Sequence, residues 1–146
     1  MTTTIRVAKD IHAPAADVWD IVSNFTSLPN WFPGVTAFEC SGKAEGSTRK
    51  VTLGNRDALT ERLITLAPDH YTIAYAIVEG LEKVEGNDVM VTVNVNALRK
   101  DACNIEWLAS VGADSPEWEE RLAADLEQLY DKALNHLKRG LEAFAD

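Results

Sequence analysis

The sequence predicts an α+β domain in which an antiparallel sheet packs against one long C-terminal helix. Three observations predict this class: an opening strand followed at once by a short helix, a middle section of consecutive strands, and a long amphipathic helix at the end. Short strands separated by turns favour an antiparallel meander, because parallel strands need long crossover connections. The length of 146 residues suits one domain, and we expect a single domain over residues 1–146.

The opening segment predicts a strand that leads into a short helix. Residues 3–12 alternate as a half-buried strand does. Pro14 suits a first helical turn, where its missing N–H is not needed. Apolar residues then recur at helical spacing, namely Val18, Trp19, Ile21, Val22 and Phe25. Pro29 and Pro33 prevent the helix from continuing.

The middle of the chain predicts six further strands. Their ranges are 35–40, 48–53, 59–66, 71–78, 89–95 and 102–111, with turn-forming residues between them. The clearest alternation is in 89–95, where valines occupy every second position and Thr92 and Asn94 lie on the other face. We expect one face of the last two strands to lie against the final helix, with Val89, Val91, Val93, Val95, Cys103, Ile105 and Trp107 on it.

The final helix has a clear beginning. Ser115 is placed as an N-cap, Pro116 fits the first turn, and Glu117 lies where the helix dipole favours an acid. Gly140 falls within the pattern and weakens the last turn. The apolar stripe is Trp118, Leu122, Leu126, Leu129, Ala133 and Leu137, ending near Leu141 and Phe144. A helix of this length needs a broad apolar surface, which a curved antiparallel sheet provides.

The composition argues against several classes of protein. Acidic residues outnumber basic ones by 23 to 14, for a formal net charge of −9, which disfavours binding to nucleic acid. Cys40 and Cys103 lack the spacing of a zinc or redox motif, so we expect buried thiols, with a disulfide between them as the alternative. No apolar run is long enough to span a membrane, and the N-terminus lacks the pattern of a secretory signal. We therefore expect a cytoplasmic protein.

Several motifs, in this order, resemble those of the START/birch-pollen-allergen superfamily (SRPBCC). They are I-x-A-P-x-x-x-V-W-x-x-V at 11–22, L-P-x-W-x-P-G-V at 28–35, G-x-x-R-x-V-x-L at 46–53, L-x-E-R-L at 59–63 and L-Y-x-x-x-L-x-x-L-K-x-x-L-E at 129–142. Within the superfamily the chain looks most like the bacterial polyketide cyclase/dehydrase group. The resemblance implies a helix-grip fold, in which a seven-stranded antiparallel sheet wraps the C-terminal helix around a hydrophobic cavity. Many relatives carry a Gly-Gly or Asp-Gly turn where residues 54–57 here read G-N-R-D.

Arg49 is the first candidate for a polar residue inside the cavity. In the strand 48–53 it alternates with Val51 and Leu53, which favour the inner face. Side chains two positions apart in a strand point to the same face, so Arg49 is expected to point inward with them.

Glu61 is the second candidate. In the strand 59–66 it shares a face with two leucines, but Ile64 and Leu66 compete for that face. The resemblance implies that Glu61 faces the cavity, because the Glu of L-x-E-R-L does so in relatives. Glu61 and Arg49 would then lie on neighbouring strands, within reach of each other.

The pair has several interpretations. Glu61 could act as a general base or accept a hydrogen bond from a ligand, with Arg49 as its counter-charge or as the anchor of a ligand carboxylate. Alternatively, the two residues form a structural ion pair. A slipped register is a third alternative, with Arg62 pointing inward and Glu61 in water.

The remaining candidates are mostly apolar or aromatic. Tyr75 offers a phenol to a ligand oxygen, and Trp31 and Phe32 occupy the turn that borders the entrance in relatives. Trp107 and Tyr130 could line the interior, and for each aromatic residue core packing is the alternative. The expected ligand-binding set is Trp31, Phe32, Val51, Tyr75, Val91, Trp107, Leu126 and Tyr130.

Two functions from different classes follow. The first is binding of a small hydrophobic molecule, such as a lipid, an aromatic or a polyketide-like compound, in an apolar pocket with one or two polar groups. The second is a cofactor-independent polyketide cyclase or dehydratase that uses Glu61 as acid or base. Binding is favoured, because the expected interior has one acid and no convincing acid/base pair; docking of a partner chain on the acidic surface is a weaker third function. The three histidines lack partners at catalytic or metal spacing, so we expect no metal and no cofactor.

Overall fold

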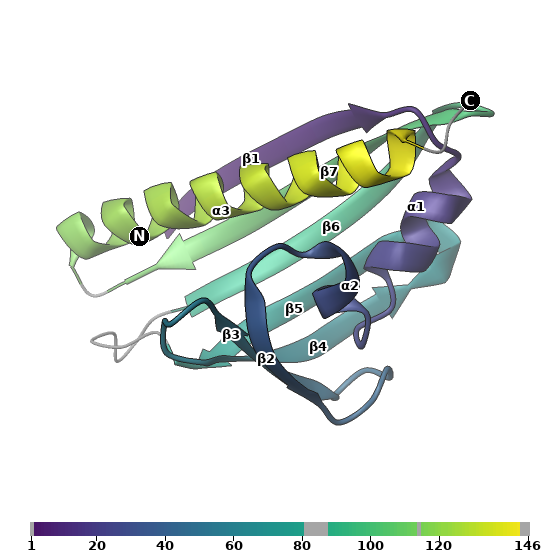
Figure 1. Cartoon of the computed structure of the whole chain (residues 1–146). Helices are drawn as coiled ribbons and strands as arrows, with labels where there is room; N and C mark the ends of the chain where they lie inside the picture. The colour runs from purple at the N-terminus through teal and green to yellow at the C-terminus, as the bar shows by residue number, and fades with distance from the viewer. Residues whose placement is uncertain (1, 81–87, 114, 144–146) are drawn as a thin grey trace.

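The computed structural model describes residues 2–80, 88–113 and 115–143, and its elements follow the predicted order (Figure 1). The elements are β1 (Thr2–Ile11), α1 (Ala15–Val22), α2 (Leu28–Trp31), β2 (Val35–Cys40), β3 (Thr48–Leu53), β4 (Leu59–Ala67), a 3₁₀ turn (Pro68–His70), β5 (Thr72–Glu79), β6 (Asp88–Arg99), β7 (Ala102–Gly112) and α3 (Pro116–Glu142).

The seven strands form one antiparallel sheet with the order β1-β7-β6-β5-β4-β3-β2. The long helix α3 lies over one face of this sheet, alongside β1 and β7, and α1 lies at one end, with α2 next to it nearer the middle of the view (Figure 1). The predicted α+β class and the helix-grip arrangement are therefore confirmed.

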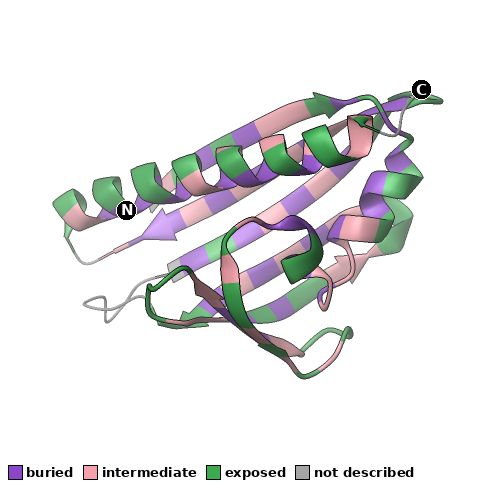
Figure 2. Cartoon of the chain, in the orientation of Figure 1, coloured by how far each residue is buried: buried purple, intermediate pink, exposed green. Residues whose placement is uncertain are grey.

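The inner face of the sheet carries the residues that the period-two pattern predicts. The four valines of β6, from Val89 to Val95, are buried, and so are their neighbours Cys103, Ile105 and Trp107 on β7. The intervening Thr92 and Asn94 are only half-buried and lie on the other face. Buried and accessible positions alternate visibly along these strands (Figure 2). This prediction is confirmed.

The first helix begins one residue later than expected. Pro14 is its N-cap, with an extended backbone at ψ 143°, and not a residue of the first turn. Its carbonyl accepts hydrogen bonds from the N–H groups of Asp17 and Val18, at 3.0 and 3.3 Å. Proline suits this position as well, because its own missing N–H lies outside the helix.

A β-bulge in the β4–β5 pairing resolves the conflict between the apolar residues of β4. It lies between Leu63 and Thr65, where Leu63 pairs with Tyr75 and Thr65 with Ala74. The extra residue, Ile64, is 41% exposed. A bulge inserts one residue into the alternation, so residues on either side of it can share a face despite odd spacing. Leu63 is therefore buried, while Leu66 pairs with Ile73 and packs against the same core.

The final helix starts as predicted and has a broader buried stripe. The Ser115 hydroxyl accepts a hydrogen bond from the N–H of Trp118 at 3.3 Å. The helix continues through Gly140 to Glu142, and Phe144 lies outside the described residues. Ala123, Tyr130 and Leu134 join the buried stripe, whereas Trp118 and Leu129 are only half-buried. This breadth is typical of a helix packed on a sheet, because positions three and four apart share one face.

A buried acid fastens the start of α3 to the sheet. Glu119 is 3% exposed, and its carboxylate accepts hydrogen bonds from the Thr3 hydroxyl at 2.7 Å and from the Ala113 N–H at 3.3 Å. Its position in the first turn also favours a negative charge. The sequence pattern alone did not mark Glu119 as a buried acid.

The other end of α3 is tied to the end of β1 and to the turn that follows it. Lys138 donates hydrogen bonds to the Asp10 carbonyl and, at 2.9 Å, to the Glu142 carboxylate. Glu142 also accepts from the His12 N–H at 3.0 Å. The hydrogen bond from Lys138, followed by that from His12, lowers the pKa of Glu142 below its ordinary value of 4.5.

Replacing Glu142 with glutamine should lower the melting temperature at pH 7, and by less at pH 3. A carboxyl group with a lowered folded-state pKa stabilises the protein above its unfolded value, here 4.5, and this contribution is lost as the pH falls through the folded-state pKa. Thermal melts of the two proteins at both pH values measure the effect. The matched control is Glu120→Gln at an exposed position of the same helix. A difference of equal size at both pH values would contradict the assignment.

Candidate functional site

Arg49 and Glu61 form a buried ion pair on the inner face of the sheet. They are register partners on the adjacent strands β3 and β4. The Arg49 Nε lies 2.7 Å from the Glu61 Oε1, and the two side chains are 5% and 9% exposed. Arg62 is exposed. The alternative with a slipped register is therefore wrong, and the placement inferred from strand alternation and the family resemblance is the observed one.

The Arg49 guanidinium is also held from the segment between α1 and α2. Its Nη1 donates to the Phe25 carbonyl at 3.1 Å. The rings of Phe25 and Tyr75 lie against it, with centroids 4.1 and 4.8 Å from Cζ. Such cation–π contacts are stronger when the cation is desolvated. Arg49 is thus fixed by a carboxylate, a carbonyl and two aromatic rings.

Two buried phenols lie near this pair. Tyr75 comes from β5 and Tyr130 from the middle of α3, and both are buried. Burial raises the pKa of each phenol well above its usual value, and the negative charge of Glu61 raises it further, while Arg49 acts in the opposite direction. Both phenols therefore remain protonated and can donate hydrogen bonds.

A hollow between the sheet and α3 has an inner and an outer part. The inner part, of about 30 Å³, reaches the ion pair, and the outer part measures about 230 Å³. The inner part is lined by Leu28, Phe32, Arg49, Val51, Leu53, Leu59, Glu61, Tyr75, Ile77, Leu126, Leu129 and Tyr130. Five of these residues, Val51, Leu53, Leu59, Leu126 and Leu129, line the outer part too, so the two parts adjoin.

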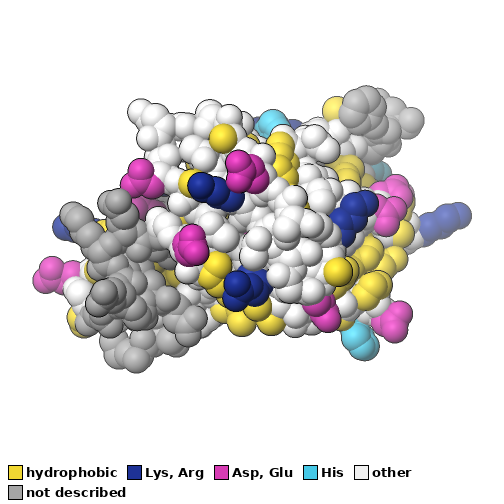
Figure 3. All heavy atoms as spheres, turned by 90° about the horizontal axis from the view of Figure 1, so that it is seen from below, with side chains coloured by type: hydrophobic (Ala, Val, Ile, Leu, Met, Phe, Trp, Pro, Cys, Tyr) yellow, Lys and Arg dark blue, Asp and Glu magenta, His cyan; other side chains and the backbone are white. Residues whose placement is uncertain are grey.

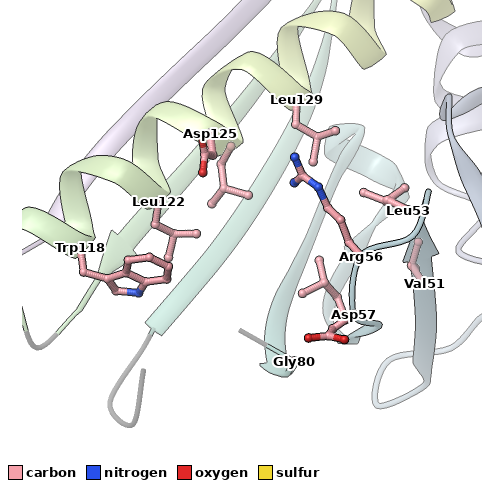
Figure 4. Close-up of a pocket in the computed structure, with 11 residues that line it drawn as sticks. Val51, Leu53, Arg56, Asp57, Gly80, Trp118, Leu122, Asp125 and Leu129 are labelled. Carbon is pink, nitrogen blue, oxygen red and sulfur yellow. The ribbon is translucent and has the colours of Figure 1, made fainter. Parts of the chain in front are cut away.

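The outer part opens between α3 and the turn after β3. Trp118, Leu122, Asp125 and Leu129 of the helix face Arg56 and Asp57 across it, and the Arg56 side chain extends toward the helix (Figure 4). The wall of the outer part is mostly apolar. Its charged residues, Arg56, Asp57 and Asp125, lie at the opening, which we call the mouth. The G-N-R-D turn at residues 54–57 therefore borders the entrance.

The expected lining residues fall into two groups. Phe32, Val51, Tyr75, Leu126 and Tyr130 line the hollow. Trp31, Val91 and Trp107 line neither part of it within the described structure.

Trp31 and Trp107 pack instead in an aromatic cluster. The Trp107 ring centroid lies 5.9 Å from that of Trp31, 6.3 Å from Tyr75 and 5.1 Å from Tyr130. The buried indole N–H of Trp107 has no hydrogen-bond partner among the described residues. For these two tryptophans the structure shows core packing beside the hollow.

A family model described as polyketide cyclase / dehydrase and lipid transport matches residues 2–142. The chain belongs to this family. The match covers nearly the whole sequence, and it agrees with the SRPBCC resemblance of the motifs. No curated protein matches the chain in sequence.

Solved structures share the fold of this polyketide cyclase/dehydrase family member. The Zhui aromatase/cyclase from a Streptomyces species has a TM-score of 0.83 at 18% identity, over 97% of this chain and 94% of that one. A protein from Thermobifida fusca has a TM-score of 0.81 at 25% identity, over 92% and 90%. Norcoclaurine synthase from Thalictrum flavum, in complex with dopamine and hydroxybenzaldehyde, has a TM-score of 0.71 at 22% identity, over 93% and 88%.

Several residues at the mouth of the hollow were not predicted from the sequence. Asp125 lies three positions after Leu122 and four before Leu129, at the spacing of the apolar stripe. Residues three and four positions apart lie on the same helix face. A charged residue among apolar ones on that face was therefore the available signal for a residue at the cavity. Arg56 and Asp57 had only the unusual turn as a signal. Trp118 was assigned to the stripe but not to the cavity.

The described residues show neither a metal site nor a membrane-spanning helix. They contain no group of three or more His, Cys, Asp or Glu side chains that could hold a metal ion. No helix among them is both long enough and apolar enough to cross a membrane. Both cysteines are free, Cys103 buried as expected and Cys40 only half-buried. On the face drawn in Figure 3, charges of both signs are scattered singly among hydrophobic side chains.

Proposed function

We propose that this family member binds a small, mostly apolar molecule in the hollow between the sheet and α3. The observation that carries the proposal is the change in polarity along the wall of the hollow. Four leucines and a valine line the region common to the outer and inner parts, and Arg49, Glu61, Tyr75 and Tyr130 line the inner end. An apolar pocket with a few convergent polar groups is the usual design of a small-molecule site. The apolar wall supplies affinity, and the inner end fixes orientation.

The size of the hollow supports a compact ligand. The outer part of about 230 Å³ is larger than an apolar cavity of about 150 Å³ that can hold benzene, and smaller than most pockets for drug-sized ligands. The inner part of about 30 Å³ has room for about one small polar group. A substituted ring fits these dimensions better than a long lipid chain.

A second candidate function is a cofactor-independent cyclase or dehydratase with Glu61 as acid or base. The observation in its favour is that two protonated phenols accompany Glu61 at the inner part, where they could donate to an enolate oxygen. Binding has the stronger support, because Arg49 already bonds the Glu61 Oε1 and the inner part holds no second carboxylate among the described residues.

Filling the hollow should weaken binding strongly without unfolding the protein. Leu129 lines both parts and is only half-buried, so Leu129→Trp can place its ring in the space. We expect the affinity for an environment-sensitive hydrophobic dye to fall at least about tenfold, because the pocket volume is lost. Fluorescence titration measures this, and circular dichroism checks the fold.

The matched control is Lys132→Trp, at an exposed position of the same helix. It should bind the dye as the unchanged protein does. Dye binding that survives Leu129→Trp, or that small aromatic compounds cannot displace from the unchanged protein, would contradict the proposed function.

A further inference from the structure

The inner end of the hollow is already neutral in charge. The Arg49 Nε and the Glu61 Oε1 are 2.7 Å apart, and both side chains are almost fully buried. A ligand carboxylate placed beside them would add a buried negative charge with no cation to match it among the residues that line the inner part. Burying an unmatched charge is unfavourable. Arg49 is therefore poorly placed to anchor a carboxylate, although the sequence allowed that role.

Glu61 keeps capacity to accept a hydrogen bond. Its Oε1 receives the bond from Arg49, and no side chain among the described residues donates to its Oε2. Glu61 also lines the inner part, which has room for about one small polar group. A hydroxyl group can donate to a carboxylate without adding charge, and such charge-assisted bonds are strong.

The phenols of Tyr75 and Tyr130 show how the inner part of the hollow changes the pKa of a hydroxyl group. Burial and the charge of Glu61 raise the pKa of both Tyr75 and Tyr130, so they stay neutral. A phenol of a bound ligand would meet the same burial and the same charge. It would also find phenolic O–H groups that can donate to its oxygen.

We propose that the site selects compact neutral molecules that carry a hydroxyl group, with that group donating to Glu61 and the apolar body lying in the outer part of the hollow. This selectivity rests on the proposed function, because it names the ligand class of the same site. It makes Glu61 the specificity-determining residue and Arg49 a positioning residue.

Three probes with the same ring system test the proposal on the unchanged protein. They are 2-naphthol, naphthalene and 2-naphthoate at pH 7, each used to displace a hydrophobic dye. We expect 2-naphthol to bind at least about tenfold more tightly than either of the others, because only it can donate to Glu61 without adding charge. Equal binding of all three, or tightest binding of 2-naphthoate, would overturn the selectivity and leave the proposed function standing. Binding of none would overturn the proposed function itself.

The charge state of a bound phenol gives an independent readout. The absorbance of 4-nitrophenol distinguishes its neutral from its ionised form, at a pH where half of the free compound is ionised. We expect the protein to shift the compound toward the neutral form. A shift toward the phenolate would overturn the proposal, because it would mean that Arg49 and the phenol donors outweigh Glu61.

A variant pair assigns the effect to Glu61. Glu61→Gln should remove most of the preference for 2-naphthol and most of the 4-nitrophenol shift, whereas Glu39→Gln, at an exposed position of β2, should leave both unchanged. An unchanged preference in a folded Glu61→Gln protein would overturn the role of Glu61. If Glu61→Gln does not fold, the probe series on the unchanged protein still decides the proposal.

Discussion

Replacing Arg49 with methionine should lower the free energy of unfolding by about 3–5 kcal/mol, because it leaves the buried Glu61 carboxylate without its partner. The two side chains are 5% and 9% exposed, so the carboxylate left behind is largely shielded from water. The variant also loses the bond to the Phe25 carbonyl and the contact with the Phe25 and Tyr75 rings. Urea denaturation of the two proteins measures the difference.

Two comparisons isolate the cause. The double variant Arg49→Met with Glu61→Leu should recover most of the loss, because removing both charges leaves no unpaired one. The exposed pair Arg6–Glu106 has a similar length of 2.6 Å, but Arg6 is 58% exposed. Arg6→Met should therefore cost less than about 1 kcal/mol. Similar losses at Arg6 and Arg49 would contradict the account, because burial would then not matter.

Truncating Trp107 to alanine should cost about 3–5 kcal/mol, the range usual for removing a large buried aromatic side chain. Trp107 is 2% exposed and packs against Trp31, Tyr75 and Tyr130. The space that it leaves would lie beside the inner part of the hollow. We therefore also expect the variant to accept bulkier ring systems than the unchanged protein.

Trp107→Phe separates packing from hydrogen bonding. It keeps a ring in the cluster and removes an indole N–H that has no partner among the described residues, so it should cost clearly less than Trp107→Ala. Denaturant melts of both variants, with dye displacement by one- and three-ring aromatics, provide the measurements. A loss below about 1 kcal/mol for Trp107→Ala would show that the cluster is not tightly packed there.

Most of the fold was predictable because the strands and α3 have unambiguous periods. The valines of β6 alternate without interruption, and the Ser115 cap marks the start of α3. In β4 the alternation failed as a guide, because a bulge is one inserted residue and Ile64 resembles any other apolar strand residue. There the family resemblance, and not the pattern, placed Glu61.

The cavity wall was only partly predictable, for a different physical reason. Trp107 and Leu126 are both buried apolar residues on elements that face one another, yet only Leu126 borders empty space. Whether a gap remains depends on how the volumes of many side chains sum across two layers. Sequence periodicity predicts which face of an element a residue lies on, but it does not predict how the side-chain volumes of two layers add up. The inward direction of Arg49 needed only alternation, and it was correct.

The bulge at Ile64 also bears on how the length of this chain can vary. With Ile64 removed, Leu63, Thr65 and Leu66 would follow one another directly and could keep their present neighbours Tyr75, Ala74 and Ile73 in an uninterrupted ladder. Removing Thr60 instead would move the residues on one side of it to the opposite face, since each step along a strand reverses direction. Evolution could therefore shorten β4 by one residue at Ile64 while leaving the carboxylate of Glu61 inside the protein.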